Sequence, residues 1–306
     1  MADRPTLAKA TALSAALGYG LVPALVKFAH LNGVPPIDST LFRTLAAVVA
    51  YAVIVRTAGY RIAITRGNFW PMLALTAATF TISTGYLASV QFIPVGLAVI
   101  IFFTFPVALL LASPLVERRP IGAWRLALAA LGFLGLAIAI GPSTGSLDPR
   151  GIILAAMAAA GAVVQFFSAR ALGGSMHPVA FGLVAHVGFL PAAFALAWWL
   201  DGGGIAALHP AGVTVTGYAT LAAVCALYVV SFFLQMRALS LAPATTVAPF
   251  FNLEPVTTIA VAALMLGETL TLNQYLGGAM VLAAVVAVGF GDRLAPRARA
   301  THRSSA

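Results

Sequence analysis

The chain has 306 residues, of which 61% are hydrophobic and 8% are charged, whereas soluble domains average about 45–50% apolar and about 25% charged residues. This composition excludes an ordinary soluble protein and favours a protein that lies mostly within a membrane. The net charge of +9 would also suit a nucleic-acid-binding protein, but the positions of the charges, described below, explain it without nucleic acid as a partner.

Ten apolar stretches follow one another along the chain, most of them long enough to cross about 30 Å of hydrocarbon. The second is the shortest and the fifth contains several glycines, so a count that differs by one stays open. The first stretch could be mistaken for a signal peptide, but the nine apolar stretches that follow it favour an uncleaved first helix. We expect transmembrane helices at 8–29, 37–55, 70–91, 95–116, 123–140, 151–172, 178–200, 213–236, 245–266 and 273–290.

Lysine and arginine residues are distributed unevenly among the predicted loops. If the N-terminal segment 1–7 is cytoplasmic, most of the 17 Lys and Arg residues fall on the cytoplasmic side, and only Lys27, Arg43 and Arg150 fall in or beside the outer half. Cytoplasmic loops are enriched in these residues. We therefore expect a multi-pass inner-membrane protein with both termini in the cytoplasm. The basic segment 292–306 is expected to be a disordered cytoplasmic tail held near anionic lipid.

Residues 93–117 and 242–268 repeat each other. A linker rich in Gly, Ser and Pro at 142–150 separates two units of five spans each, 8–141 and 151–291. Because five is odd, the second unit enters the membrane from the opposite side, and such inverted repeats are typical of secondary transporters with the substrate site between the copies. The repeated positions are two prolines and a glutamate in each copy: Pro94, Pro106 and Glu117, then Pro243, Pro255 and Glu268.

The fifth span of each unit, 123–140 and 273–290, is rich in Gly and Ala. Small residues let helix backbones approach closely in lipid, so these two helices are expected to be packing elements. They could pack within one chain, which is the simpler interpretation, or form the interface of a homodimer.

The LEPV…LGE string at 253–268, the duplicated five-span unit, Lys27 late in the first span and Arg43 early in the second resemble the EamA family of the drug/metabolite transporter superfamily. The resemblance covers nearly the whole chain. It implies an all-α, polytopic membrane protein of ten transmembrane helices in two inverted five-helix repeats. It also implies transport of small metabolites such as amino acids, purines or drugs. The first repeat departs from the second because Phe105 stands where Glu254 stands.

Glu254 is the foremost candidate for the site, because it lies near the middle of the predicted span 245–266, immediately before Pro255. Ionisable groups inside a membrane are functional candidates by default. Glu254 could bind a cationic or amino group of the substrate or carry a coupling proton. The structural alternative is a protonated glutamate that is hydrogen-bonded to a neighbouring helix. Pro255 removes one helix hydrogen bond, which could expose polar backbone to the cavity.

Other polar groups are expected at a similar depth. Asn252, Gln165 and His186 could contact the substrate or merely join two helices by a hydrogen bond. Arg43 lies several residues inside its span and could line the outer vestibule, where it would meet Asp38 or an anionic substrate. Aromatic side chains cluster around the repeated helices, and four of them are candidates for shaping the cavity: Tyr19, Tyr86, Phe105 and Tyr228.

Four further residues are expected at span ends. Lys27 can extend its amine to the interface, and Glu268 is expected to be solvated or paired with an arginine. Trp198 and Trp199 are expected to anchor the end of the seventh span at the interface.

The sequence contains no enzyme motif in the structural context that the motif requires. Residues 141–145 match the pattern G-x-S-x-G but lie in the linker without a preceding strand, and the sequence has no HExxH, P-loop or paired CxxC motif. We therefore expect no enzyme activity, cofactor or metal, and predict a secondary exporter of small metabolites that works by alternating access, with proton coupling as a candidate drive. The alternatives are an intramembrane enzyme or lipid-handling scaffold, and a passive channel.

Overall fold

The computed structural model describes residues 4–105, 107–108, 111–112, 123–140, 147–172, 175–209, 212–241 and 253–294. These residues form ten α-helices and one short 3₁₀ helix, η2 (Ala206–Leu208). The first half of the chain contributes α1 (Arg4–Leu31), α2 (Pro36–Ala58), α3 (Arg66–Ser89), α4 (Val95–Phe102) and α6 (Ala123–Ile140). The second half contributes α7 (Pro149–Ala171), α8 (Pro178–Leu200), α9 (Val215–Leu241), α11 (Leu253–Leu266) and α12 (Leu272–Leu294).

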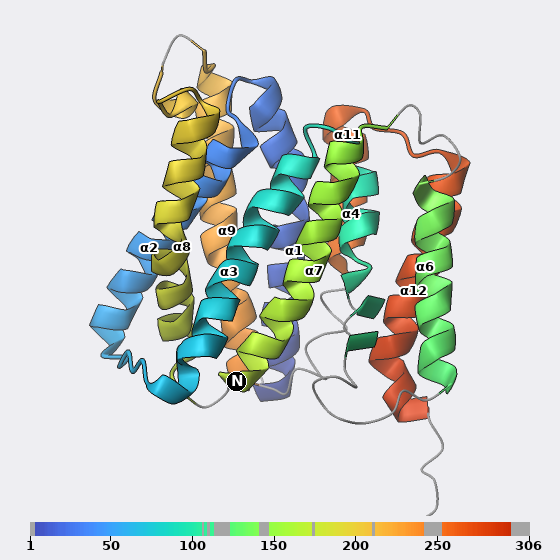
Figure 1. Cartoon of the computed structure of the whole chain (residues 1–306), viewed down its shortest axis with the longest axis horizontal. Coiled ribbons are helices and arrows are strands. Elements are labelled where there is room, and N and C mark those ends of the chain that lie inside the picture. The colour runs from blue at the N-terminus through green and yellow to red at the C-terminus, as the bar shows by residue number, and fades with distance from the viewer. Residues whose placement is uncertain are drawn as a thin grey trace, which may run out of the picture.

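The helices of the two halves pair in a reciprocal pattern. Helix α1 packs on α9, and its counterpart α7 packs on α3, while α2 pairs with α8, α4 with α11 and α6 with α12. This exchange of equivalent partners is the pattern expected when a twofold axis relates two inverted five-helix repeats. The pair α2 and α8 forms one edge of the bundle and α6 and α12 the other. The start of α1 and the end of α12 lie at the same end (Figure 1).

Half of the described helices are individually long and apolar enough to cross a membrane: Thr6–Leu31, Pro36–Ala58, Arg66–Ser89, Pro178–Leu200 and Val215–Gln235. Shorter apolar stretches occur in α6, α7 and α11. At the end of α8, Trp198 and Trp199 are 50% and 72% exposed, which agrees with the interfacial position predicted for them.

Proline sets several of the helix ends. Pro36 and Pro178 lie in the first turn of α2 and α8, where a missing N–H removes no helix bond. The expected span 95–116 is interrupted, because α4 ends at Phe102 and a turn follows it. The sequence has a proline at 106, which cannot donate to the carbonyl of residue 102 four positions earlier.

Glycines bring α6 and α12 into backbone contact within the chain. A Cβ added to Gly135 would lie 2.7 Å from the carbonyl oxygen of Gly277, and one added to Gly277 would lie 2.5 Å from the backbone nitrogen of Ala139. The Gly/Ala-rich fifth helices are therefore packing elements inside the monomer, the simpler of the two interpretations of their sequence.

Replacing Gly277 by leucine should lower the free energy of unfolding by about 1–3 kcal/mol, because overpacked side chains force neighbouring backbone apart. Thermal unfolding in detergent, followed by loss of the monodisperse species, measures this change. Gly67→Ala is the matched control, since the nearest atom to its new Cβ is 3.9 Å away. Equal unfolding temperatures for both variants would contradict the close packing of α6 and α12.

Candidate functional site

Tyr19 lies in the interior of the bundle because the residues on both sides of it are small. Gly18 packs against α9, and Gly20 packs against α11, where an added Cβ would lie 3.0 Å from the backbone oxygen of Glu254. The Tyr19 hydroxyl donates a hydrogen bond to Oε1 of Gln235 on α9 at 2.9 Å. Tyr19 is thus held between two helices of the second repeat.

Arg43 of α2 is 5% exposed. Its Nη2 donates to the backbone oxygen of Ser83 on α3 at 3.2 Å, and its Cζ lies 4.3 Å from the ring centroid of Tyr228 on α9, a cation–π distance. The expected pairing with Asp38 does not form, because Asp38 Oδ2 instead accepts the backbone N–H of Ala207 at 2.7 Å. Residues five apart on a helix point in different directions, which explains why these two side chains do not meet.

His186 of α8 is fully buried. Its Nδ1 lies 2.7 Å from the carbonyl oxygen of Gly182, and its Nε2 lies 2.7 Å from the hydroxyl of Tyr228. A carbonyl can only accept, so Nδ1 carries the proton and Tyr228 donates to Nε2. Both ring nitrogens are therefore satisfied, and His186 orients Tyr228.

Glu254 is the second residue of the described part of α11, which begins at Leu253. The residues before Leu253 lie outside the described part of the chain, so the predicted position of Glu254 near the middle of a span stays a prediction. Tyr19 and Tyr86 lie within electrostatic reach of its carboxylate. Among the described residues, no side chain forms a hydrogen bond or ion pair with it. Protein surrounds the Glu254 side chain, yet it keeps partial exposure.

The first repeat contributes aromatic surface to the same region. Tyr86 of α3 stacks on Phe102 with ring centroids 4.5 Å apart, and Phe105 packs on Phe102 and Phe103 at 5.4 and 5.9 Å. The hydroxyls of Tyr86 and Thr258 lie near each other, and neither forms a hydrogen bond of normal geometry within the described residues. Phe105 of the first repeat stands where Glu254 stands in the second. Among the described residues of this region, the carboxylate of Glu254 therefore comes from the second repeat alone.

The structure brings most of the predicted residues that it describes together, but Gln165 stands apart. Gln165 donates from Nε2 to Oγ1 of Thr79 at 3.0 Å, a bond that joins α7 to α3, as the helix-joining interpretation predicts. Asn252 lies outside the described residues. The residues that gather around Tyr19 and Tyr228, which we call the central cluster, are Tyr19, Arg43, Tyr86, Tyr228 and Glu254, with His186 behind Tyr228.

Three contributors to the central cluster were not predicted from the sequence. Gln235 binds Tyr19, and the hydroxyl of Tyr51 donates to the carbonyl of Val229 at 3.2 Å. An amide or phenol inside an apolar stretch is a visible signal for both. Ser83 binds Arg43 through its backbone oxygen. Any residue type would provide this oxygen, so the residue type at position 83 does not predict the contact.

An ion pair joins the two repeats at the end of the bundle that holds the α11–α12 connection. Lys27 Nζ of α1 lies 3.0 Å from Oε1 of Glu268, with 22% and 14% of the two side chains exposed. Lys27 also donates to the carbonyl of Ile93 at 3.3 Å, and Glu268 Oε2 accepts the backbone N–H of Gly96 at 3.4 Å. Glu268 is thus paired, with a lysine in place of the expected arginine, and Lys27 points to it instead of extending to the interface.

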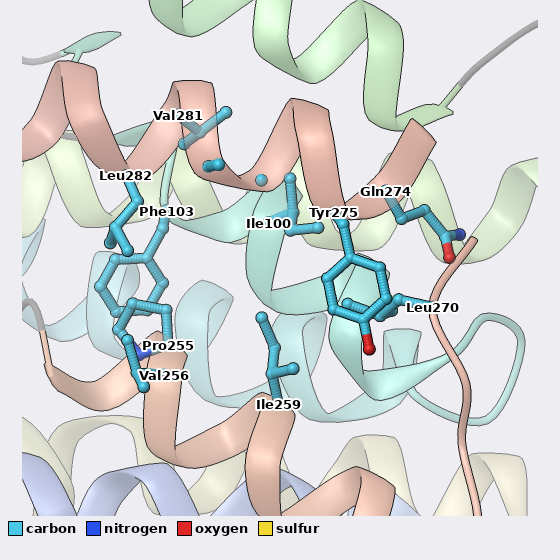
Figure 2. Close-up of a pocket in the computed structure, with 12 residues that line it drawn as sticks. Ile100, Phe103, Pro255, Val256, Ile259, Leu270, Gln274, Tyr275, Val281 and Leu282 are labelled. Carbon is cyan, nitrogen blue, oxygen red and sulfur yellow. The ribbon is translucent and has the colours of Figure 1, made fainter. Parts of the chain in front are cut away.

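A separate cavity of about 210 Å³ lies between α4, α11 and α12. Figure 2 shows aliphatic and aromatic side chains around it, with the Gln274 amide and the Tyr275 hydroxyl towards one end. Val256 and Tyr275 are exposed, so the cavity opens at the outer surface of the bundle. No charged side chain lines it, and it differs in this respect from the central cluster.

Within the described part of the chain, no three His, Cys, Asp or Glu residues are arranged to hold a metal ion. The central cluster combines a buried cation, a carboxylate and several phenols. These groups can bind a polar solute through charge-assisted hydrogen bonds.

Comparisons with known proteins show the family and the fold of the chain. A model of the EamA-like transporter family matches residues 7–141 and 149–290. The threonine/homoserine exporters RhtA of Escherichia coli (strain K12) and Salmonella typhimurium (strain LT2) are each 31% identical over 217 residues. Each match covers 68% of this chain and 66% of the relative, just under two thirds of its length. One protein of known crystal structure superposes with a TM-score of 0.59 and 16% identity, over 94% of this chain and 98% of that one.

Proposed function

The chain belongs to the EamA-like transporter family of multi-pass membrane proteins, and we propose that it is a secondary transporter that exports small, amino-acid-like metabolites across the inner membrane. Membership of this family supports transport of a small metabolite. The function for which the relatives are named, export of threonine and homoserine, supports the narrower solute class. Such solutes carry one carboxylate and one amine.

The observation that carries the proposal is the partly buried carboxylate of Glu254 near Tyr19, which forms no hydrogen bond or ion pair within the described residues. Tyr19 interacts electrostatically with both Glu254 and Arg43, so groups of opposite charge lie near one phenol. An unpaired charge is costly inside a membrane, and a solute or proton that neutralises it lowers that cost. We propose that Glu254 binds the amine of the solute or carries the coupling proton.

Alternating access is the proposed mode of transport. The Lys27–Glu268 pair closes the bundle at the end that holds the α11–α12 connection, and it joins the two repeats. Movement of one repeat against the other would break this contact and expose the central cluster to that side. We propose that this end faces outward and that both termini are cytoplasmic, as the loop charges indicate.

A growth assay tests the proposed function. A strain that overproduces the protein should tolerate higher concentrations of threonine, homoserine and their toxic analogues, because export lowers their internal concentration. The control is the same strain with the empty vector, grown on the same panel extended to purines and drugs. Unchanged tolerance to every amino acid, together with altered tolerance to purines or drugs, would contradict the proposed solute class.

A further inference from the structure

Arg43 is a buried cation with unused hydrogen-bond donors. The guanidinium has five N–H donors. Nη2 donates to the backbone oxygen of Ser83, while Nε forms no hydrogen bond within the described residues. A buried charge is strongly disfavoured unless it is paired, and the face of Tyr228 compensates it only in part.

No carboxylate of the described residues neutralises Arg43. Asp38 accepts the backbone N–H of Ala207, and Glu268 is paired with Lys27. Glu254 forms no ion pair within the described residues. The buried positive charge of Arg43 therefore has no counter-ion among the described residues.

The groups around Arg43 hold it in place. Tyr228 lies under the guanidinium, and its hydroxyl is fixed by His186. The carbonyl of Ser83 that receives Arg43 also accepts the hydroxyl of Thr40 at 3.0 Å. A guanidinium that is fixed from two sides and has open donors is a preorganised receptor for a planar anion.

We propose that Arg43 is the residue that binds the carboxylate of the transported solute and thereby restricts transport to solutes with a carboxylate. The proposal rests on the proposed function, because it assigns one part of the same site. A carboxylate fits better than a phosphate, since Arg43 is the single cation of the central cluster and the Glu254 carboxylate would repel a dianion. The solute class is a small zwitterion, with its carboxylate at Arg43.

The test compares L-threonine with L-threonine amide, which keeps the amine but lacks the carboxylate. Purified protein is assayed for thermal stabilisation by each solute and, in proteoliposomes, for saturable transport of each. Wild type should bind threonine about 10- to 100-fold more tightly than the amide, the range expected for hydrogen bonds to a charged group. Arg43→Gln should lose this preference, and Arg43→Lys should keep part of it.

Arg56→Gln is the matched control, because Arg56 is an exposed arginine near the other end of α2. It should behave as wild type. A wild-type protein that does not discriminate between the two solutes, or an Arg43→Gln variant that discriminates equally well, overturns the role of Arg43. If Arg43→Gln does not fold, the role of Arg43 is judged from the preference for threonine over its amide in wild type and in Arg43→Lys. Absence of saturable transport in wild type contradicts the proposed function instead. In that case thermal stabilisation by the two solutes still tests whether Arg43 binds the carboxylate.

Discussion

Replacing Glu254 by glutamine is expected to reduce net export by about 10- to 100-fold, the effect of losing charge-assisted hydrogen bonds worth about 1.5–3 kcal/mol. The substitution keeps the shape of the side chain and removes its ability to ionise. Glu254 forms no hydrogen bond or ion pair within the described residues, so the variant should fold with nearly unchanged stability. Net export is measured as loss of labelled solute from proteoliposomes under an imposed proton gradient.

The same variant separates the two roles proposed for Glu254. If the carboxyl group carries the coupling proton, Glu254→Gln should lose gradient-driven export and keep exchange of internal for external solute. If it binds the solute amine, both processes should weaken together. Asp148→Asn is the matched control, because Asp148 is paired only with the exposed Arg150 and such pairs contribute little. Normal gradient-driven export by Glu254→Gln would contradict both roles.

Breaking the Lys27–Glu268 pair is expected to open one end of the bundle. The pair is largely buried, so its loss should shift the balance between closed and open states by about 1–2 kcal/mol, or about 5- to 30-fold. Glu268 also accepts a backbone N–H of α4. The single variants Lys27→Gln and Glu268→Gln should therefore both favour the open state, with the larger shift for Glu268→Gln.

Alkylation of the native cysteine can measure this opening, so no cysteine needs to be introduced. Cys225 is the single cysteine of the sequence, is half-buried on α9, and lies near Arg43. It is ten residues, or about 15 Å, from the start of α9. Its rate of alkylation by a membrane-impermeant reagent should rise in both single variants.

Two controls accompany this measurement. Asp148→Asn removes an exposed ion pair and should leave the alkylation rate unchanged. The double exchange Lys27→Glu with Glu268→Lys restores the attraction and should return the rate towards that of wild type. An alkylation rate that does not respond to loss of the pair would show that it does not hold this end closed.

The sequence predicted the architecture because lipid imposes simple requirements. Apolar length, loop charge and proline position are all local properties, and they identified the helices and the repeat. Helix interruption at Phe102 was not predicted, although the proline at 106 supplies a physical reason for it.

Pairings across the bundle could not be predicted in the same way. Lys27 and Glu268 were both recognised at span ends, but they lie far apart in the chain and meet only because α1 packs on α11. Arg43 was recognised as a candidate, and of the two partners suggested for it Asp38 does not bind it, since proximity in sequence to Asp38 says nothing about the face on which each side chain lies. Tyr228 and His186 were listed separately as candidates, and the hydrogen bond between them depends on how α8 meets α9.

Counterflow in proteoliposomes tests most directly whether one site between two moving repeats carries the solute. Vesicles loaded with unlabelled threonine at high concentration should accumulate labelled threonine transiently, with a rate that saturates, because a carrier returns more often when its site is occupied. Uptake that rises linearly with concentration and is indifferent to internal solute would instead identify a passive pore and contradict alternating access.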